Sequence, residues 1–114
     1  MRNNYIDKKK LYEEIIKCKK ASKLSNSLFE MIYLIVINSN KKLSYENEQD
    51  REDCIQVALE VLLKKWDRFD ETMYTNAFAY YTQISKNAFA KAWNELHKIK
   101  TSDRITIDNN LKNI

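Results

Sequence analysis

The sequence of 114 residues contains no glycine and no proline. Tight β-hairpin turns, phosphate-binding loops and the dinucleotide-binding fingerprint all depend on glycine, so these motifs are excluded. The remaining composition favours helices joined by loops of Asn, Ser, Lys and Asp. The length suits one domain with a single hydrophobic core. The composition therefore predicts an all-α fold, and the periodicity of its apolar residues predicts a compact helical bundle of about four helices.

Long apolar runs, cysteine and histidine are also scarce. The longest apolar run, MIYLIVI at residues 31–37, is far shorter than the roughly 18 residues of a membrane span. Cys18 and Cys54 form no CxxC motif and we expect no secretory leader, which favours reduced thiols in the cytoplasm. His97 is the single histidine, and neither cysteine lies near it on the same predicted helix. We therefore expect a cytoplasmic protein that is not an enzyme, with no cofactor and no membrane partner.

An acidic cluster lies between the two central apolar segments. It consists of Glu46, Glu48, Asp50, Glu52 and Asp53. The cluster lacks the glycine-pinned spacing of a calcium-binding loop. Solvated surface charge is therefore the better interpretation, and no metal site is predicted.

Charge is distributed unevenly along the chain. The formal net charge is +4 and the sequence pI is about 9.0, which favours a polyanionic partner. Residues 1–23 carry eight Lys and Arg against three Asp and Glu, a net +5. Residues 43–63 carry one against six, a net −5. Two oppositely charged surfaces suggest two different partners.

Hydrophobic periodicity predicts four helices, of which the first two form the N-terminal part. The first covers residues 6–23, with Lys and Glu on its outer side. Ser27 followed by Glu30 resembles a capping box for a buried second helix over residues 28–38, with a β-strand as the alternative. Residues 38–48 are polar and indicate a loop. The apolar side of the first helix consists of Ile6, Leu11, Ile15 and Ile16.

The third predicted helix, residues 50–69, separates into two faces at 100° per residue. Its apolar face consists of Ile55, Leu59, Leu62, Leu63 and Trp66. Its polar face consists of Asp53, Gln56, Glu60, Lys64 and Asp67. Exposed helical faces are usually charged, so a solvated surface explains the polar face without any function.

The fourth predicted helix, residues 76–100, is rich in aromatic side chains. Its inward face consists of Phe78, Tyr81, Ser85, Phe89, Ala92 and Leu96. Its outer face consists of Tyr80, Gln83, Asn87, Lys91, Asn94 and Lys98. Gln and Asn can pair with base edges, Lys can neutralise phosphate and Tyr can stack on a base. The alternative is a solvated face that carries an incidental tyrosine.

The segment DCIQVALEVLLKKWDRFDETMYTNAFAYYTQISKNAFAKAWN, residues 53–94, resembles the second conserved region of bacterial sigma-70 family transcription initiation factors. The D-x-I-Q pattern and the later F-D are matched by Asp53, Ile55, Gln56, Leu62, Phe69 and Asp70. The phrase RFDETMYTNAFAYYTQISKNAF is similar to the late-transcription sigma factors of T-even-type bacteriophages. Its matches are Asp70, Glu71, Thr72, Tyr74, Ala79, Tyr80, Thr82, Gln83, Asn87, Ala88 and Phe89.

The resemblance implies two partners. In this family the D-x-I-Q helix docks on the clamp helices of the largest subunit of core RNA polymerase, and the aromatic helix opens the minus-ten element of promoter DNA. The polymerase-binding residues would be Asp53, Gln56, Glu60 and Lys64. The DNA-binding residues would be Tyr74, Tyr80, Gln83, Ile84, Lys86, Asn87, Lys91, Asn94 and Lys98. On such an aromatic, an unstacked base regains roughly 1–3 kcal/mol.

The sequence also departs from the family. Primary sigma factors have aromatic residues at the positions of Gln83 and Ile84, and polar residues at those of Val57 and Leu59. We therefore expect weaker melting and docking, and a co-activator is a candidate helper. Phage late sigma factors end in an apolar segment that binds the replication sliding clamp, which the tail RITIDNNLKNI matches poorly.

The resemblance also implies a division of the chain into a domain and a tail. A sigma region 2-like domain would cover residues 1–100, and residues 101–114 would form a flexible C-terminal tail. The alternative function is a helical interaction module that binds polymerase or another host protein without contacting DNA. An autonomous helix-turn-helix repressor is less favoured, because the short glycine-type turn is absent.

Overall fold

The computed structural model describes residues 6–73 and 76–112, with side chains up to residue 97. This part of the chain contains α-helices and one 3₁₀ helix, and no β-strand. The elements are α1 (Lys8–Ala21), α2 (Asn26–Asn40), α3 (Glu48–Lys65), η1 (Trp66–Arg68) and α4 (Ala77–Lys112). The prediction of an all-α bundle of four helices is confirmed, and the apolar segment at residues 28–38 is helical.

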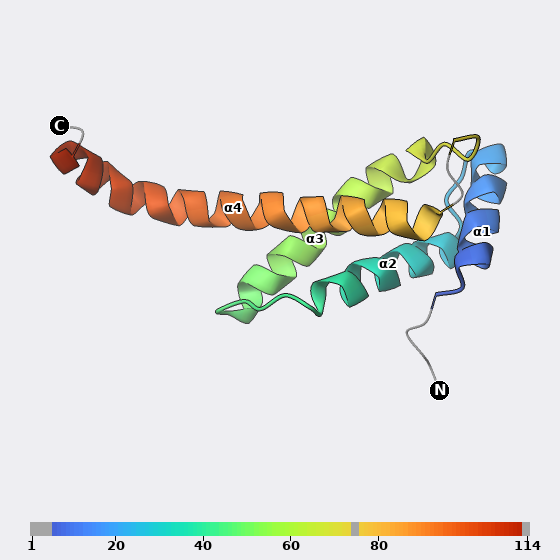
Figure 1. Cartoon of the computed structure of the whole chain (residues 1–114), viewed down its shortest axis with the longest axis horizontal. Helices are drawn as coiled ribbons and strands as arrows, with labels where there is room; N and C mark the ends of the chain where they lie inside the picture. The colour runs from blue at the N-terminus through green and yellow to red at the C-terminus, as the bar shows by residue number, and fades with distance from the viewer. Residues whose placement is uncertain (1–5, 74–75, 113–114) are drawn as a thin grey trace.

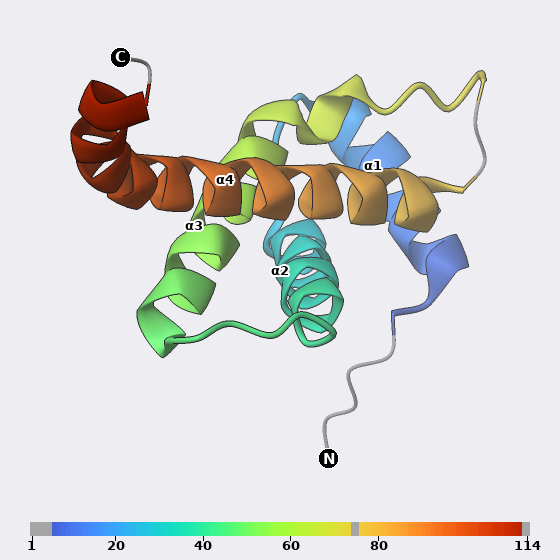
Figure 2. The ribbon, with the colours of Figure 1, turned by 60° about the vertical axis from the view of Figure 1, so that its left-hand side comes forward.

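The long helix α4 crosses the other elements and packs against α1, α2 and α3 (Figure 1). Its C-terminal part continues beyond the three shorter helices, as a second view also shows (Figure 2). The sequence predicted that this helix would end near residue 100, but it runs on to Lys112. The division into a domain at residues 1–100 and a tail at residues 101–114 stays a prediction.

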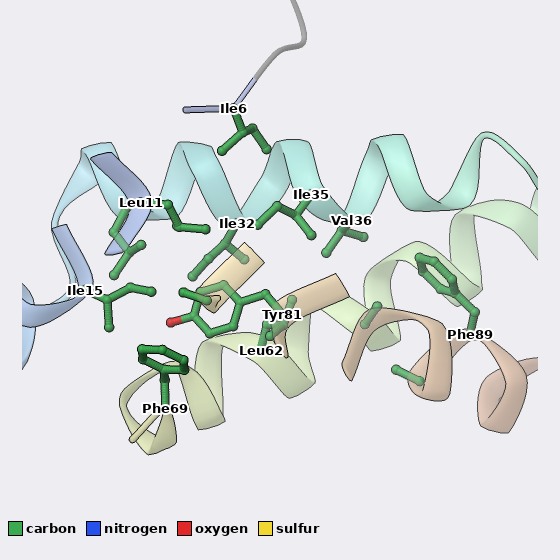
Figure 3. Packing of buried hydrophobic residues seen from close by; sticks show 14 of the residues in the cluster. Ile6, Leu11, Ile15, Ile32, Ile35, Val36, Leu62, Phe69, Tyr81 and Phe89 are labelled. Carbon is green, nitrogen blue, oxygen red and sulfur yellow. The ribbon is translucent and has the colours of Figure 1, made fainter. Parts of the chain in front are cut away.

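The hydrophobic core lies where the four helices meet (Figure 3). Tyr81 sits at its centre, and its phenol donates a hydrogen bond to the carbonyl oxygen of Trp66 at 2.7 Å. This bond offsets the cost of burying the hydroxyl, and burial raises the pKa of Tyr81. The core side chains without any exposed area are Leu11, Ile15, Leu28, Ile32, Val36, Cys54, Ala58, Leu62, Phe69 and Tyr81.

Side-chain caps fix where the helices begin. Ser25 caps α2 by accepting a hydrogen bond from the Leu28 N–H at 3.0 Å, and its hydroxyl donates to Glu14 at 2.6 Å. The predicted capping box of Ser27 and Glu30 is wrong, because Ser27 already lies inside the helix. The hydrogen bond to Glu14 of α1 ties this cap to another helix, a contact that no local pattern reveals.

The segment between α3 and α4 is tied to α1. The α-helix α3 ends at Lys65, earlier than predicted, and η1 then turns Phe69 into the core. Lys19 Nζ donates to the Phe69 carbonyl oxygen at 2.8 Å and forms an ion pair with Glu71 at 2.7 Å. The Tyr12 hydroxyl donates to the Glu71 carbonyl oxygen at 3.4 Å. These contacts fix the approach to α4.

Candidate functional site

The middle of α4 presents a polar face to solvent, as the sequence predicted. Gln83, Asn87, Lys91 and Asn94 are all exposed. The Gln83 side-chain amide donates to the Asn87 side-chain oxygen at 2.9 Å. The two amides therefore hold each other in place, and each keeps further donor and acceptor capacity for a ligand.

Tyr80 differs from the other members of this face because it is half-buried. Its ring lies edge-on to Phe69 at a centroid distance of 5.3 Å and an interplanar angle of 61°. The expectation of a freely exposed tyrosine was therefore only partly right. Tyr80 belongs to the margin of the core as well as to the outer face, and Ile84 is half-buried in the same way.

Of the three other predicted DNA-binding residues, the structure describes the side chain of Lys86 alone. Lys86 is exposed, but it projects on the neighbouring side of α4. Tyr74 lies outside the described residues, and so does the side chain of Lys98. The face that the structure describes therefore consists of Tyr80, Gln83, Asn87, Lys91 and Asn94, which we call the α4 outer face.

Helix α3 has a comparable polar face. Gln56, Glu60 and Lys64 are exposed, as predicted. Asp53 is half-buried and accepts a hydrogen bond from the Gln49 side-chain amide at 2.9 Å. These four residues form the α3 outer face.

The inward side of α3 is centred differently from the prediction. Leu62 is fully buried as expected, but Ile55, Leu59 and the other predicted apolar positions are only half-buried. Cys54 and Ala58, which the prediction omitted, have no exposed area. The spacing of four residues from Cys54 through Ala58 to Leu62 carried this signal, but small side chains contribute little to an apolar pattern.

The turn after Phe69 lies between η1 and α4, and its side chains form hydrogen bonds of their own. The Thr72 hydroxyl and N–H donate to Asp70 at 2.6 and 3.0 Å, which lowers the pKa of that carboxyl group. The hydrogen bond from Lys19 lowers the pKa of Glu71 in the same way. The sequence resemblance matched Asp70, Glu71 and Thr72 without a role for them. Lys19 had no detectable signal, because its partner lies 52 residues away.

Metal-binding groups and membrane-spanning helices are absent from the described part of the chain. It holds no group of three His, Cys, Asp or Glu side chains able to bind a metal ion. None of its helices has the length and apolar character needed to cross a membrane. Cys18 and Cys54 are buried and unpaired with each other.

No family model, no curated protein and no solved structure matches this chain. The α4 outer face carries amides, a lysine and part of a tyrosine ring, whereas the α3 outer face is mainly acidic and amide.

Proposed function

We propose that this protein is a phage-type sigma factor that binds core RNA polymerase and directs the recognition and melting of an AT-rich, minus-ten-like promoter element. The observation that carries the proposal is the presence, in one helical bundle, of an amide and lysine face on α4 and an acidic face on α3. The resemblance of residues 53–94 to sigma region 2 suggests the partner of each face.

The α4 outer face suits single-stranded DNA. The paired amides of Gln83 and Asn87 can offer donors and acceptors to base edges, and the ammonium group of Lys91 can neutralise a phosphate. The exposed part of the Tyr80 ring offers a stacking surface for an unpaired base. Packing against Phe69 holds that ring in one orientation, so little side-chain entropy is lost when a base stacks on it.

The α3 outer face suits a basic protein partner. Glu60 and Asp53 place two carboxylates about two helical turns apart, with the Gln56 amide between them. Such a row supports docking on the clamp helices of the largest polymerase subunit. Charged side chains at the rim of an interface act mainly on association rate and orientation, which suits a factor that must dissociate again.

Free protein is expected to bind duplex DNA weakly. The net charge is only +4, and Lys91 is the single described cation on the α4 outer face. Core polymerase would supply the remaining contacts, with a co-activator or the sliding clamp as further proposed partners. The protein would act in the cytoplasm of the infected bacterial cell.

The proposal is tested by co-purification with core RNA polymerase, followed by promoter opening measured with permanganate footprinting. The double variant Gln83→Ala/Asn87→Ala should keep polymerase binding and lose opening of a fully paired promoter. A template that is already mismatched across the melted region should restore much of the activity, because the unpairing cost of a few kcal/mol is removed. Failure of the unmodified protein to bind polymerase would refute the proposal.

A helical interaction module without DNA contact is the second candidate. It is favoured by Phe29 and Tyr33 on α2, which are 38% and 43% exposed and lie stacked at a centroid distance of 6.5 Å. Such a module predicts that the Gln83→Ala/Asn87→Ala variant retains every activity. Loss of partner binding on Phe29→Ser/Tyr33→Ser substitution, with promoter opening absent throughout, would favour this second candidate.

A further inference from the structure

A groove of about 520 Å³ opens between the loop that joins α2 to α3 and the middle of α4. Leu43 and Tyr45 line it from the loop, and Phe89 and Trp93 line it from α4. Leu43 is 41% exposed and Trp93 is 42% exposed, although both are large apolar side chains. Two such side chains at one concave site indicate a binding surface better than an isolated exposed residue does.

The loop side of the groove is held in a fixed conformation. The Arg51 guanidinium of α3 donates to the side-chain and carbonyl oxygens of Asn40 at 2.7 and 3.1 Å, and to the Leu43 carbonyl oxygen at 3.1 Å. It also lies 4.9 Å from the centroid of the Tyr45 ring. The Asn40 side-chain amide donates to the Tyr45 hydroxyl at 2.8 Å. The wall is therefore formed before any ligand arrives, which lowers the entropy cost of binding.

The helix side is fixed as well. The Trp93 indole stacks on the His97 ring at a centroid distance of 3.8 Å. His97 Nε2 in turn lies 3.7 Å from a carboxylate oxygen of Asp50 on α3. The indole thus has a defined orientation, and tryptophan is among the side chains that most often dominate protein interfaces.

The charge at the groove has one sign. Lys42 and Lys86 line it, and no Asp or Glu does. Within the described part of the chain, neither lysine makes an ion pair. An occupant with negative charge beside an apolar group would therefore complement the site.

We propose that this groove binds an acidic peptide segment of a partner protein, with one bulky apolar side chain placed between Leu43 and Trp93. An apolar centre with a charged rim is the usual composition of a protein interface. Nucleic acid fits less well, because most of its contacts go to phosphates and the groove offers only two ammonium groups beside a largely apolar lining. The groove is separate from both outer faces apart from Asn94, which also lines it.

The test is an NMR titration of the nitrogen-15-labelled full chain with a synthetic acidic peptide. The peptide contains one Phe and one Leu, spaced a helical turn apart, and its other residues are mainly Glu and Asp. Ser44 also lines the groove from the loop. We expect saturable shifts at the Trp93 indole N–H and the Ser44 amide, with a dissociation constant of about 1 mM or tighter. Peptides with Ala in place of the two apolar residues, or with amides in place of the acids, should bind about tenfold more weakly.

Matched variants locate the binding. Trp93→Ala and the double variant Lys42→Glu/Lys86→Glu should each weaken binding about tenfold or more. Met73→Ala removes a 70% exposed apolar side chain, and Lys20→Glu reverses an exposed lysine on α1, so both should leave the affinity unchanged. Spectra of the free variants verify that each remains folded.

Four outcomes would overturn the proposal. The first is the absence of saturable shifts at Trp93 and Ser44. The second is equal binding by the acidic peptide and its amide counterpart. The third is saturation of the groove by oligothymidylate while the peptide stays silent, which would make nucleic acid the occupant. The fourth is a concentration-dependent shift of Trp93 without peptide, which would make a second copy of this chain the occupant.

Discussion

The outer faces of α3 and α4 have the same relation to the core but different chemistry. Cys54 and Leu62 point inward from α3, and Tyr81 and Phe89 do so from α4, so in each helix the opposite side is mostly exposed. Asp53 and Tyr80 are the half-buried members of these two faces. The α3 outer face carries Asp53, Glu60 and a single lysine, whereas the α4 outer face has no carboxylate.

Helix packing therefore decides which positions on α3 and α4 are exposed to solvent. The residue types at these exposed positions can then vary according to function. Exposed substitutions away from caps and buried contacts usually change stability by no more than about 0.5 kcal/mol. Opposite chemistry on two such faces is therefore compatible with one fold. Substitutions on the inward and outward sides of these helices test this separation, because they should differ in their effect on stability.

Truncating the inward side of α4 should have the largest effect. Phe89 is 2% exposed, so Phe89→Ala should lower the free energy of unfolding by about 3–5 kcal/mol, as large core truncations do. Urea denaturation followed by circular dichroism measures the loss. Lys91→Ala on the outer face of the same helix is the matched control and should be nearly neutral. Equal effects of the two substitutions would show that α4 does not pack as described.

Truncating Tyr80 should cost less stability than truncating an inward residue of α4 and more than truncating an outward one. Its half-buried ring contacts Phe69, so Tyr80→Ala should destabilise the protein by about 1–2 kcal/mol. Tyr80→Leu keeps apolar contact and should recover part of this loss, but it removes the stacking surface. If Tyr80→Leu opens promoters as well as the unmodified protein does, base stacking on Tyr80 is ruled out.

The ion pair between Lys19 and Glu71 should give a smaller, pH-dependent effect. The hydrogen bond from Lys19 lowers the pKa of Glu71 below its ordinary value of 4.5. The ion pair therefore stabilises the fold at pH values above the ordinary pKa of glutamate, and this stabilisation is lost as the pH falls through the lowered pKa of Glu71. Glu71→Gln should be slightly less stable at neutral pH and should lose less stability on acidification below about pH 5.

Thermal unfolding of both proteins across this pH range measures the difference between them. Glu13→Gln, at an exposed position on α1, is the control and should follow the unmodified protein. Parallel curves for Glu71→Gln and the unmodified protein would show that the ion pair does not anchor the turn.

The two outer faces themselves should have the smallest effect on stability and separate effects on function. Gln56→Ala/Glu60→Lys and Gln83→Ala/Asn87→Ala, all at exposed positions, should each change the free energy of unfolding by no more than about 0.5 kcal/mol per site. The first pair should abolish co-purification with core polymerase, and the second should abolish promoter opening. Loss of both activities in either variant would remove the distinction between the faces.

Periodicity alone predicted most of the fold, because each helix buries one side and the spacing of its apolar residues marks that side. The four helices, the inward positions Tyr81, Ser85 and Phe89, and the exposed Gln83 and Asn87 all follow from it. Periodicity did not predict the contacts of polar side chains whose partners lie far away in the sequence. Ser25 rather than Ser27 caps α2, and its hydroxyl donates a hydrogen bond to Glu14 of another helix. Arg51 fixes a loop through Asn40, eleven residues earlier.

Local patterns in the sequence were enough to predict the helical class and the exposed amides and charges on the outer faces of α3 and α4. Helix packing was needed to bring Tyr80 against Phe69, to tie Lys19 to the turn at Glu71, and to join Leu43 and Trp93 in one groove. The physical reason is that helix periodicity is a local property of neighbouring residues, whereas these contacts join side chains far apart in the chain and exist only after the helices have packed.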